Sequence, residues 1–146
     1  MSDSFINCLM HVIFSTKERK TYLKADIRTD LYPMMAAIAK ERNFMALKIG
    51  GTDDHIHVLL SLTATIAVAD AVRAIKAVSS KWLNETKLRG FSWQRGYGAF
   101  SVSLSNKQKV IDYISNQEAH HKKMDFRTEF IAFLKQHDIP YDPKFL

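Results

Sequence analysis

Apolar residues fill both faces of the first extended segment of the chain, residues 5–15, and alternate with polar residues in two later segments. A strand that is apolar on both faces is covered on both, so we predict that residues 5–15 form a central strand of a sheet. Residues 44–50 and 55–62 are predicted as two further strands. The residues between them, Gly-Gly-Thr-Asp, are turn formers and predict a hairpin.

A helical spacing of apolar residues marks the segments between and after these strands. In residues 27–42 and 66–87 apolar side chains recur every three or four positions, which predicts two long helices. Residues 99–104 alternate again and predict a fourth strand. Two more helices are predicted at residues 106–122 and 128–137, because both segments return to the helical spacing.

The predicted order of elements is β-α-β-β-α-β followed by two helices. This is the split βαβ pattern of ferredoxin-like and RRM-like antiparallel sheets, so we predict an α+β fold that forms a single domain over residues 1–146. In that topology the first and third strands are central. The two crossover helices cover one face of the sheet, and the helix predicted at residues 106–122 is available to cover the other.

The composition is that of an ordinary globular chain. With 146 residues, it is long enough to bury roughly 68–70% of its unfolded surface without a disulfide. Cys8 is the only cysteine, and its alternating apolar surroundings predict a buried core thiol. No apolar run approaches the roughly 18 residues of a membrane span. We therefore predict a cytoplasmic protein.

The positive charges are concentrated in one part of the chain. The net charge is +6, and residues 73–109 contain eight basic residues against Glu85 alone, which makes this segment +7 and the remainder −1. A basic segment in a nearly neutral chain is typical of a polyanion-binding face, because each neutralised phosphate releases condensed counterions. An ordinary solvated helix is the alternative.

Two pairs of polar residues suggest chemistry. His55 and His57 are separated by one residue on a predicted strand, so both imidazoles point to the same face. Tyr113 and Gln117 are four residues apart and share one face of the helix predicted to cover that strand. Two neutral imidazoles and a carboxamide leave a divalent ion its full charge, which suits a phosphodiester as the remaining ligand. Each pair alone is more often structural.

The combination predicts a covalent reaction on DNA. The Tyr113 hydroxyl would attack the phosphorus atom while a 3′-hydroxyl leaves. Because a free tyrosine has a pKa near 10, it needs activation by the ion or by a basic neighbour such as Lys122. The phosphotyrosine ester keeps the bond energy, so a new 3′-hydroxyl can reverse the step and join strands.

Four motifs carry a family resemblance. DHIHVLLSL, WQRGYGAFSVS, YISNQEAHH and EFIAFLKQHDIPYDPKFL follow one another over essentially the whole chain, after the opening HVIFSTKERK. Together they resemble the single-tyrosine transposases of the IS200/IS605 insertion-sequence family, which are members of the HUH endonuclease superfamily.

The resemblance implies an enzyme that depends on Mg²⁺ or Mn²⁺ and that cuts and rejoins single-stranded DNA beside hairpins at transposon ends. It implies that Tyr113 is the nucleophile, that His55 and His57 bind the metal, and that Gln117 is the third ligand. It also implies a homodimer in which the tyrosine helix of one subunit completes the histidine site of the other.

Several residues near these motifs have open roles. Asp53 and Asp54 precede the histidines, where an aspartate could orient a ligand from outside the metal sphere or belong to the hairpin turn, and we favour the turn. His120 and His121 could flank the metal, touch DNA or interact with the helix end. His11 is expected to be a core or site-flanking histidine.

A loop rich in aromatic residues adjoins the basic segment and is suited to stacking on unpaired bases, although Trp93 could equally belong to the core. The DNA-binding candidates from this loop, the basic segment and the tyrosine helix are Arg73, Lys76, Lys87, Trp93, Gln94, Arg95, Tyr97, Lys107 and Lys122.

Two other functions fit the same patterns. One is a domesticated relative that acts on palindromic repeats of a host chromosome. The other is a non-catalytic module that binds single-stranded nucleic acid, since basic split βαβ domains are common.

Overall fold

A computed structural model describes residues 4–146, and the first three residues of the predicted domain lie outside the described residues. Three short 3-10 helices, η1 to η3, occupy Lys17–Arg19, Leu104–Asn106 and Pro143–Phe145. The strands and α-helices are, in chain order, β1 (Cys8–Ser15), α1 (Ala25–Glu41), β2 (Met45–Gly51), β3 (His55–Leu62), α2 (Val68–Thr86), β4 (Gly98–Val102), α3 (Lys107–Ser115), α4 (Gln117–His120) and α5 (Phe126–Gln136).

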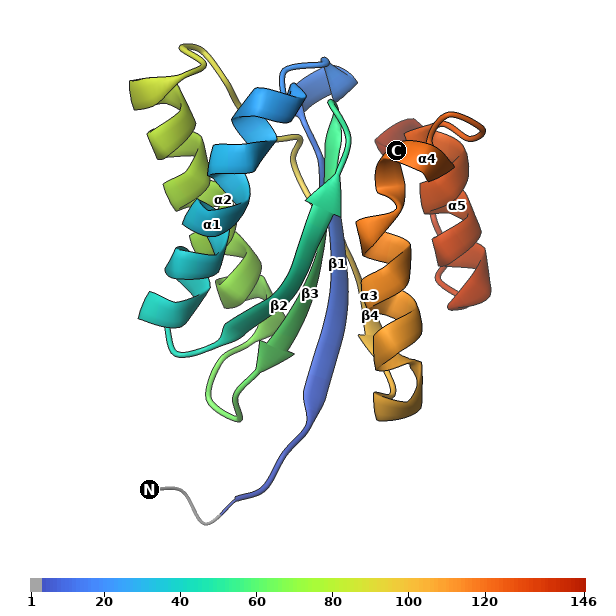
Figure 1. Cartoon of the computed structure of the whole chain (residues 1–146). Coiled ribbons are helices and arrows are strands. Elements are labelled where there is room, and N and C mark those ends of the chain that lie inside the picture. The colour runs from blue at the N-terminus through green and yellow to red at the C-terminus, as the bar shows by residue number, and fades with distance from the viewer. Residues whose placement is uncertain (1–3) are drawn as a thin grey trace.

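The strands form one antiparallel sheet in the order β2-β3-β1-β4 (Figure 1). The predicted α+β fold is therefore confirmed, and β1 and β3 are the central strands as expected. Both central strands are buried along most of their length, because helices cover both faces of the sheet.

The larger core lies between the sheet and the pair α1 and α2, which Figure 1 shows on one side of the sheet. Val12, Ile56 and Val58 point from the central strands into this core, and each is at most 1% exposed. Cys8 packs against this core at its edge and is half-buried, so it is less buried than the predicted core thiol. Cys8 opens β1, where the cover of the helices ends.

The opposite face of the sheet is covered by α3 and α5. Ile114 of α3 packs against Leu9 and Leu59, and Leu134 of α5 packs against Ile13 and Phe100. The expected cover of the second face is thus present, and α3 lies close to β2 and β3. His55 and His57 point toward this side of the sheet.

The segment predicted as one helix over residues 106–122 is divided in two. α3 ends at Ser115, and the short α4 begins at Gln117. At the junction the Asn116 side chain donates to the carbonyl oxygen of Asp112, 2.9 Å away. A polar side chain that competes for backbone groups in this way disfavours continuous helix. Tyr113 and Gln117 consequently lie on successive short helices.

The last helix begins two residues earlier than predicted. Asp125 caps α5, since its carboxylate accepts from the Thr128 backbone N–H at 2.8 Å. Among the described residues, no helix is both long and apolar enough to cross a membrane.

Gly50 allows α3 to approach the sheet. A Cβ atom at this position would collide with the Ile114 carbonyl oxygen and lie 2.9 Å from Ile114 Cγ2. We expect Gly50→Ala to lower the free energy of unfolding by about 1–3 kcal/mol, the usual cost of an overpacked contact. Chemical denaturation measures this, with Lys48→Ala in the same strand as the control. Equal stability of the two variants would show that α3 does not depend on this close contact.

Candidate active site

His55 and His57 of β3 lie beneath the C-terminal helices, and both are 0% exposed. The alternation of the strand directs both imidazoles away from the larger core. His55 Nε2 is 3.1 Å from Gln117 Oε1, which α4 supplies. The structure therefore brings together Gln117 and the two histidines that the sequence analysis placed in one site.

The turn before β3 orients His55. Asp54 Oδ1 lies 2.7 Å from His55 Nδ1, and Thr52 Oγ1 lies 2.9 Å from the same nitrogen. A carboxylate on Nδ1 keeps the proton there and leaves Nε2 free, which is how an outer carboxylate usually fixes a ligating histidine. Of the two alternatives for Asp54, this contact favours the orienting role over the simple turn. Asp53 pairs instead with Arg28 and Lys24.

His11 orients His57. His11 Nε2 is 2.8 Å from His57 Nδ1, and His57 Nε2 is 2.9 Å from Glu129 Oε1. Burial lowers the pKa of His57 to about 4 and that of His11 to about 3, against the partial opposing effect of Glu129. Both imidazoles are therefore neutral near pH 7, and His57 in this form can act as a metal ligand. His11 was expected to be either a core histidine or a histidine that flanks the site, and this contact favours the second role.

The sequence analysis missed Glu129, whose carboxylate lies at the centre of the site. Glu129 is 1% exposed on α5. Burial raises the pKa of Glu129, but its contacts with His121, His57 and Tyr113 outweigh that effect and hold the pKa well below the usual range. One signal was available: Phe126, Glu129 and Phe133 follow the helical spacing of an apolar stripe, so Glu129 lies on the buried face.

Tyr113 reaches the same carboxylate from α3. Its hydroxyl donates to Glu129 Oε2 and lies 3.2 Å from His120 Nε2. Burial, together with the adjacent Glu129, raises the pKa of Tyr113 above its usual value, so the phenol stays protonated. Lys122, the activating neighbour considered above, is exposed. Glu129 therefore accepts the hydrogen bond of the Tyr113 hydroxyl, and His120 lies within reach of the same oxygen.

His120 and His121 both approach the carboxylate from α4 and its end. His120 Nε2 lies 3.3 Å and His121 Nε2 lies 3.1 Å from Glu129 Oε2. The His121 ring also lies against His55, with 4.3 Å between ring centroids. The sequence analysis left open whether this pair flanks the metal, touches DNA or interacts with the helix end. The contacts favour a position beside the metal site.

The donor groups fit a divalent cation. One ligand atom from each member of the histidine–glutamate cluster (His55, His57, His121 and Glu129) lies within 4.8 Å of every other. Two ligands of one ion, each bound at about 2.1 Å, lie up to about 4.2 Å apart, so only small side-chain shifts are needed. The Nε2 atom of His121 is buried and has no hydrogen-bond partner among the described residues. A buried nitrogen without a partner is the condition that a bound ion would relieve.

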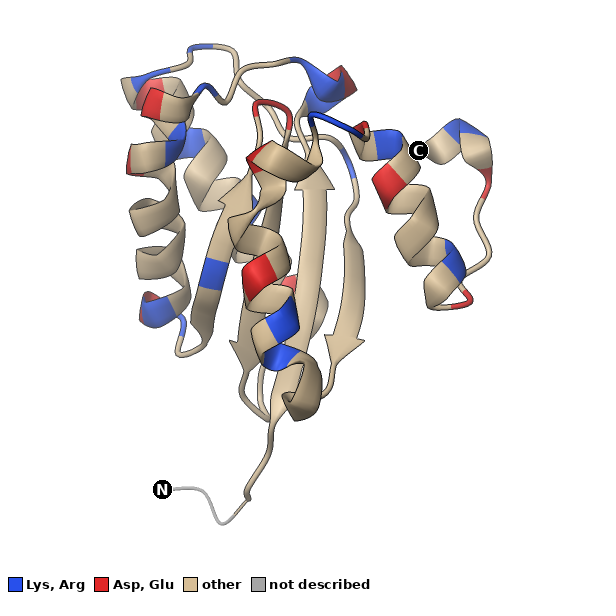
Figure 2. Ribbon diagram, turned by 45° about the vertical axis from the view of Figure 1, so that its right-hand side comes forward, with Lys and Arg blue, Asp and Glu red and all other residues tan. Residues whose placement is uncertain are grey.

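The DNA-binding candidates do not form one surface. Arg73 and Lys76 of α2 line a groove of about 500 Å³ with Gln94, Arg95 and Tyr97 of the aromatic loop. Lys107 belongs to α3, on the opposite side of the sheet. Lys and Arg positions are spread over several elements with acidic positions among them (Figure 2).

Several of these candidates also have partners within the fold, among them Lys76, Lys87 and Trp93. Lys76 Nζ donates to the carbonyl oxygens of Gln94 and Gly96 at 2.8 and 2.7 Å, so it holds the aromatic loop in place. Lys87 pairs with Asp30 of α1 at 2.8 Å. Trp93 is 8% exposed and donates to Ser79, which favours the core alternative for this ring over stacking on bases.

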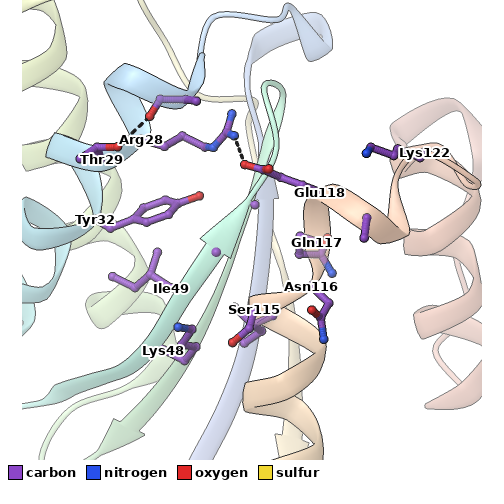
Figure 3. A pocket seen from close by; sticks show the side chains of 15 residues that line it. Arg28, Thr29, Tyr32, Lys48, Ile49, Ser115, Asn116, Gln117, Glu118 and Lys122 are labelled. Carbon is purple, nitrogen blue, oxygen red and sulfur yellow. Dashed lines mark hydrogen bonds and ion pairs between the residues drawn. The ribbon is translucent and has the colours of Figure 1, made fainter.

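Clefts on separate sides reach Gln117 and Tyr113. One of about 610 Å³ runs between α1, β2 and α4, where Figure 3 shows Lys48, Lys122 and the Arg28–Glu118 ion pair beside Gln117. The other, of about 380 Å³, is lined by His11 and Tyr113 together with residues of β4 and α5. The nucleophile and the amide ligand are therefore each reached by a separate cleft.

Comparison with known proteins is consistent with this geometry. Residues 4–117 match the sequence profile of a family described as "Transposase IS200 like". The ISDra2 transposase TnpA of Deinococcus radiodurans is 27% identical over 114 residues, which cover 73% of this chain and 81% of that protein.

Two solved structures share the fold. A crystal structure from Deinococcus radiodurans R1, provisionally assigned as a transposase, has a TM-score of 0.67 at 22% identity and covers 80% of this chain and 95% of that one. A REP-associated tyrosine transposase bound to a REP hairpin has a TM-score of 0.62 at 15% identity, covering 83% of this chain and 73% of that one.

Proposed function

This chain belongs to the family of IS200-like transposases, and from that membership we propose that it cleaves and rejoins single-stranded DNA at hairpin-flanked transposon ends. The reaction passes through a covalent 5′-phosphotyrosine on Tyr113 and uses a divalent metal. One observation carries the proposal: Tyr113, Gln117 and the two strand histidines converge on one buried cluster. The solved hairpin complex of a protein of this fold supports a DNA hairpin as the partner.

In the proposal His55, His57 and Gln117 hold Mg²⁺ or Mn²⁺. The ion, when bound, would stabilise negative charge on the oxygens of the scissile phosphate. The support lies in the neutral imidazole of His57 and in the contacts of Asp54 and His11, which direct both Nε2 atoms toward the same place.

Tyr113 is the proposed nucleophile. Its oxygen forms a bond to phosphorus as the bond from phosphorus to the 3′-oxygen breaks. Glu129 Oε2 accepts the phenol proton in the hydrogen bond that already exists, and this proton finally resides on the released 3′-hydroxyl. Because burial and the adjacent Glu129 raise the pKa of Tyr113, the phenol is protonated at neutral pH and must give up its proton during the attack.

We propose that the DNA strand approaches Tyr113 through the cleft that it lines with His11. Asn106 and Lys109 line the same cleft and offer polar and basic contacts to phosphates. Gln94, Arg95 and Tyr97 are exposed beside Arg73, and this groove on the other side of the sheet is suited to the hairpin or to flanking strand.

We also propose a homodimer in the cytoplasm that shares its active sites between subunits. Four large apolar side chains, Phe5, Ile6, Met45 and Leu104, are 52–97% exposed. They flank the same end of the sheet, where Met45 pairs with Ser61. An exposed apolar patch of this kind is typical of an interface, and a partner's tyrosine helix could take the place that α3 occupies in the single chain.

Two alternatives keep the same fold. A domesticated relative acting on chromosomal palindromes would use the same site. Transposon ends with hairpins on both sides of the gene would favour the transposase over this relative. A non-catalytic nucleic-acid-binding module would be unaffected by metal.

We expect Tyr113→Phe to reduce covalent attachment to single-stranded DNA by roughly 1000-fold or more, because the variant lacks the nucleophilic oxygen. Hairpin binding should be largely unchanged. A protein–DNA adduct that survives denaturing electrophoresis measures the attachment, with DNA from the flanks of the gene as substrate. Tyr22→Phe, which removes a hydroxyl distant from the cluster, is the control. Full attachment by Tyr113→Phe would exclude the proposed function.

Mixing two inactive variants tests the shared sites. If the tyrosine helix acts on the partner's histidines, subunit exchange between Tyr113→Phe and His57→Gln rebuilds one intact site in each mixed dimer. Random exchange should then restore about a quarter of the wild-type sites. Adduct formation after mixing measures this, and each variant alone is the control. No recovery despite verified exchange would show that each chain uses its own histidines.

A further inference from the structure

The part of the chain after Gln117 contributes two groups to the cluster that the proposed function does not assign to the metal. The family match ends at residue 117. His121 follows α4, and Glu129 lies in the first turn of α5. Both side chains are at least nine-tenths buried, at 9% and 2% exposure. Each nevertheless places a ligand atom within 4.8 Å of ligand atoms of His55 and His57.

The position of Glu129 brings one carboxylate against both strand histidines. Glu129 Oε1 is 2.9 Å from His57 Nε2 and 3.6 Å from His55 Nε2. These are the two ring nitrogens that face away from Asp54 and His11 and into the cluster. A carboxylate oxygen facing two such nitrogens occupies the position of a further ligand to one cation.

His121 supplies independent evidence. Its Nε2 atom is buried 3.1 Å from Glu129 Oε2 without the geometry of a hydrogen bond, and it has no other partner in the described part of the chain. Leaving a buried polar nitrogen unsatisfied costs about 1–3 kcal/mol. A cation bound between His121 and Glu129 would satisfy the nitrogen and the carboxylate together.

We propose that Glu129 and His121 are additional metal ligands, so that the cation is held by three imidazoles and a carboxylate as well as by Gln117. This inference rests on the proposed function and extends its metal site. The carboxylate reduces the net charge of the loaded site by one. Imidazole nitrogens favour transition metals, whereas Mg²⁺ prefers oxygen ligands, so the donor set prefers Mn²⁺ and later divalent ions to Mg²⁺.

Metal titration of the full-length protein tests the inference without any DNA. After removal of metal with a chelator, Mn²⁺ is added and the free ion is followed by electron paramagnetic resonance. We expect Glu129→Gln and His121→Gln each to weaken Mn²⁺ binding by about 100-fold or more, since the loss of an outer partner of a ligand already costs about 10- to 100-fold. The wild-type protein should retain Mn²⁺ against a roughly tenfold excess of Mg²⁺, because imidazole nitrogens bind transition metals more tightly than they bind Mg²⁺.

Matched controls are Glu85→Gln and His137→Gln, which remove a glutamate and a histidine outside the cluster. Both should bind Mn²⁺ as the wild type does. Pulsed electron paramagnetic resonance of the bound Mn²⁺ adds a measurement that does not depend on binding affinity. It should detect nitrogen couplings from three imidazoles in the wild type and from two in His121→Gln.

The outcomes separate this inference from the proposed function. Wild-type affinity in both Glu129→Gln and His121→Gln, with binding lost in His57→Gln, would overturn the additional ligands and leave the transposase site intact. Two imidazole couplings in the wild type would overturn His121 as a ligand. Metal binding that depends on Glu129 and His121, in a protein that forms no DNA adduct, would support the ligand set and count against the proposed reaction.

Discussion

The arrangement of the site depends on one buried negative charge, the carboxylate of Glu129. Taking a carboxylate out of water is costly unless polar groups surround it. Its partners here come from separate elements: His57 from β3, Tyr113 from α3, and His121 from the end of α4. These contacts connect the C-terminal helices to the sheet at the site, beside the apolar packing of Ile114 and Leu134. The same contacts hold the pKa of Glu129 below its ordinary range despite burial, so the carboxylate is ionised at neutral pH.

A second layer of contacts fixes the groups that face this charge. Asp54 and His11 each bind the Nδ1 side of one strand histidine, which directs both Nε2 atoms to the cluster. Arg28 connects the turn before β3 to α4, because its guanidinium pairs with Asp53 and with Glu118. These contacts run from α1 through the turn to the segment that carries Gln117. The site is thus held by rigid elements at both ends, which is the condition for reproducible ligand geometry.

The distribution of the basic residues bears on how DNA would bind. Residues 73–109 are strongly positive in sequence, yet α2 and α3 lie on opposite faces of the sheet, so the segment supplies two surfaces instead of one. The groove beside Arg73 and the cleft beside Tyr113 are therefore separate. A substrate with a folded hairpin and an unpaired cleavage region has two parts to be recognised, and two separate surfaces suit it. In this arrangement phosphate contacts would set the position of the strand while Tyr113 performs the reaction.

The sequence by itself determined the order of elements, the central strands and the pairing of His55 and His57 with Tyr113 and Gln117, because these follow from periodicities of two and 3.6 residues. It misjudged the length of the tyrosine helix, since the side chain of Asn116 competes for backbone groups there. Only the tertiary structure decided that Glu129 is central and that His121 joins it. Both lie far from the strand histidines in sequence, and no local pattern specifies which buried charge meets which imidazole. The partners of Glu129 depend on how α5 packs on the sheet. Once the carboxylate is buried, water cannot reach it, and it can be paired only by the polar groups that lie next to it in the folded chain.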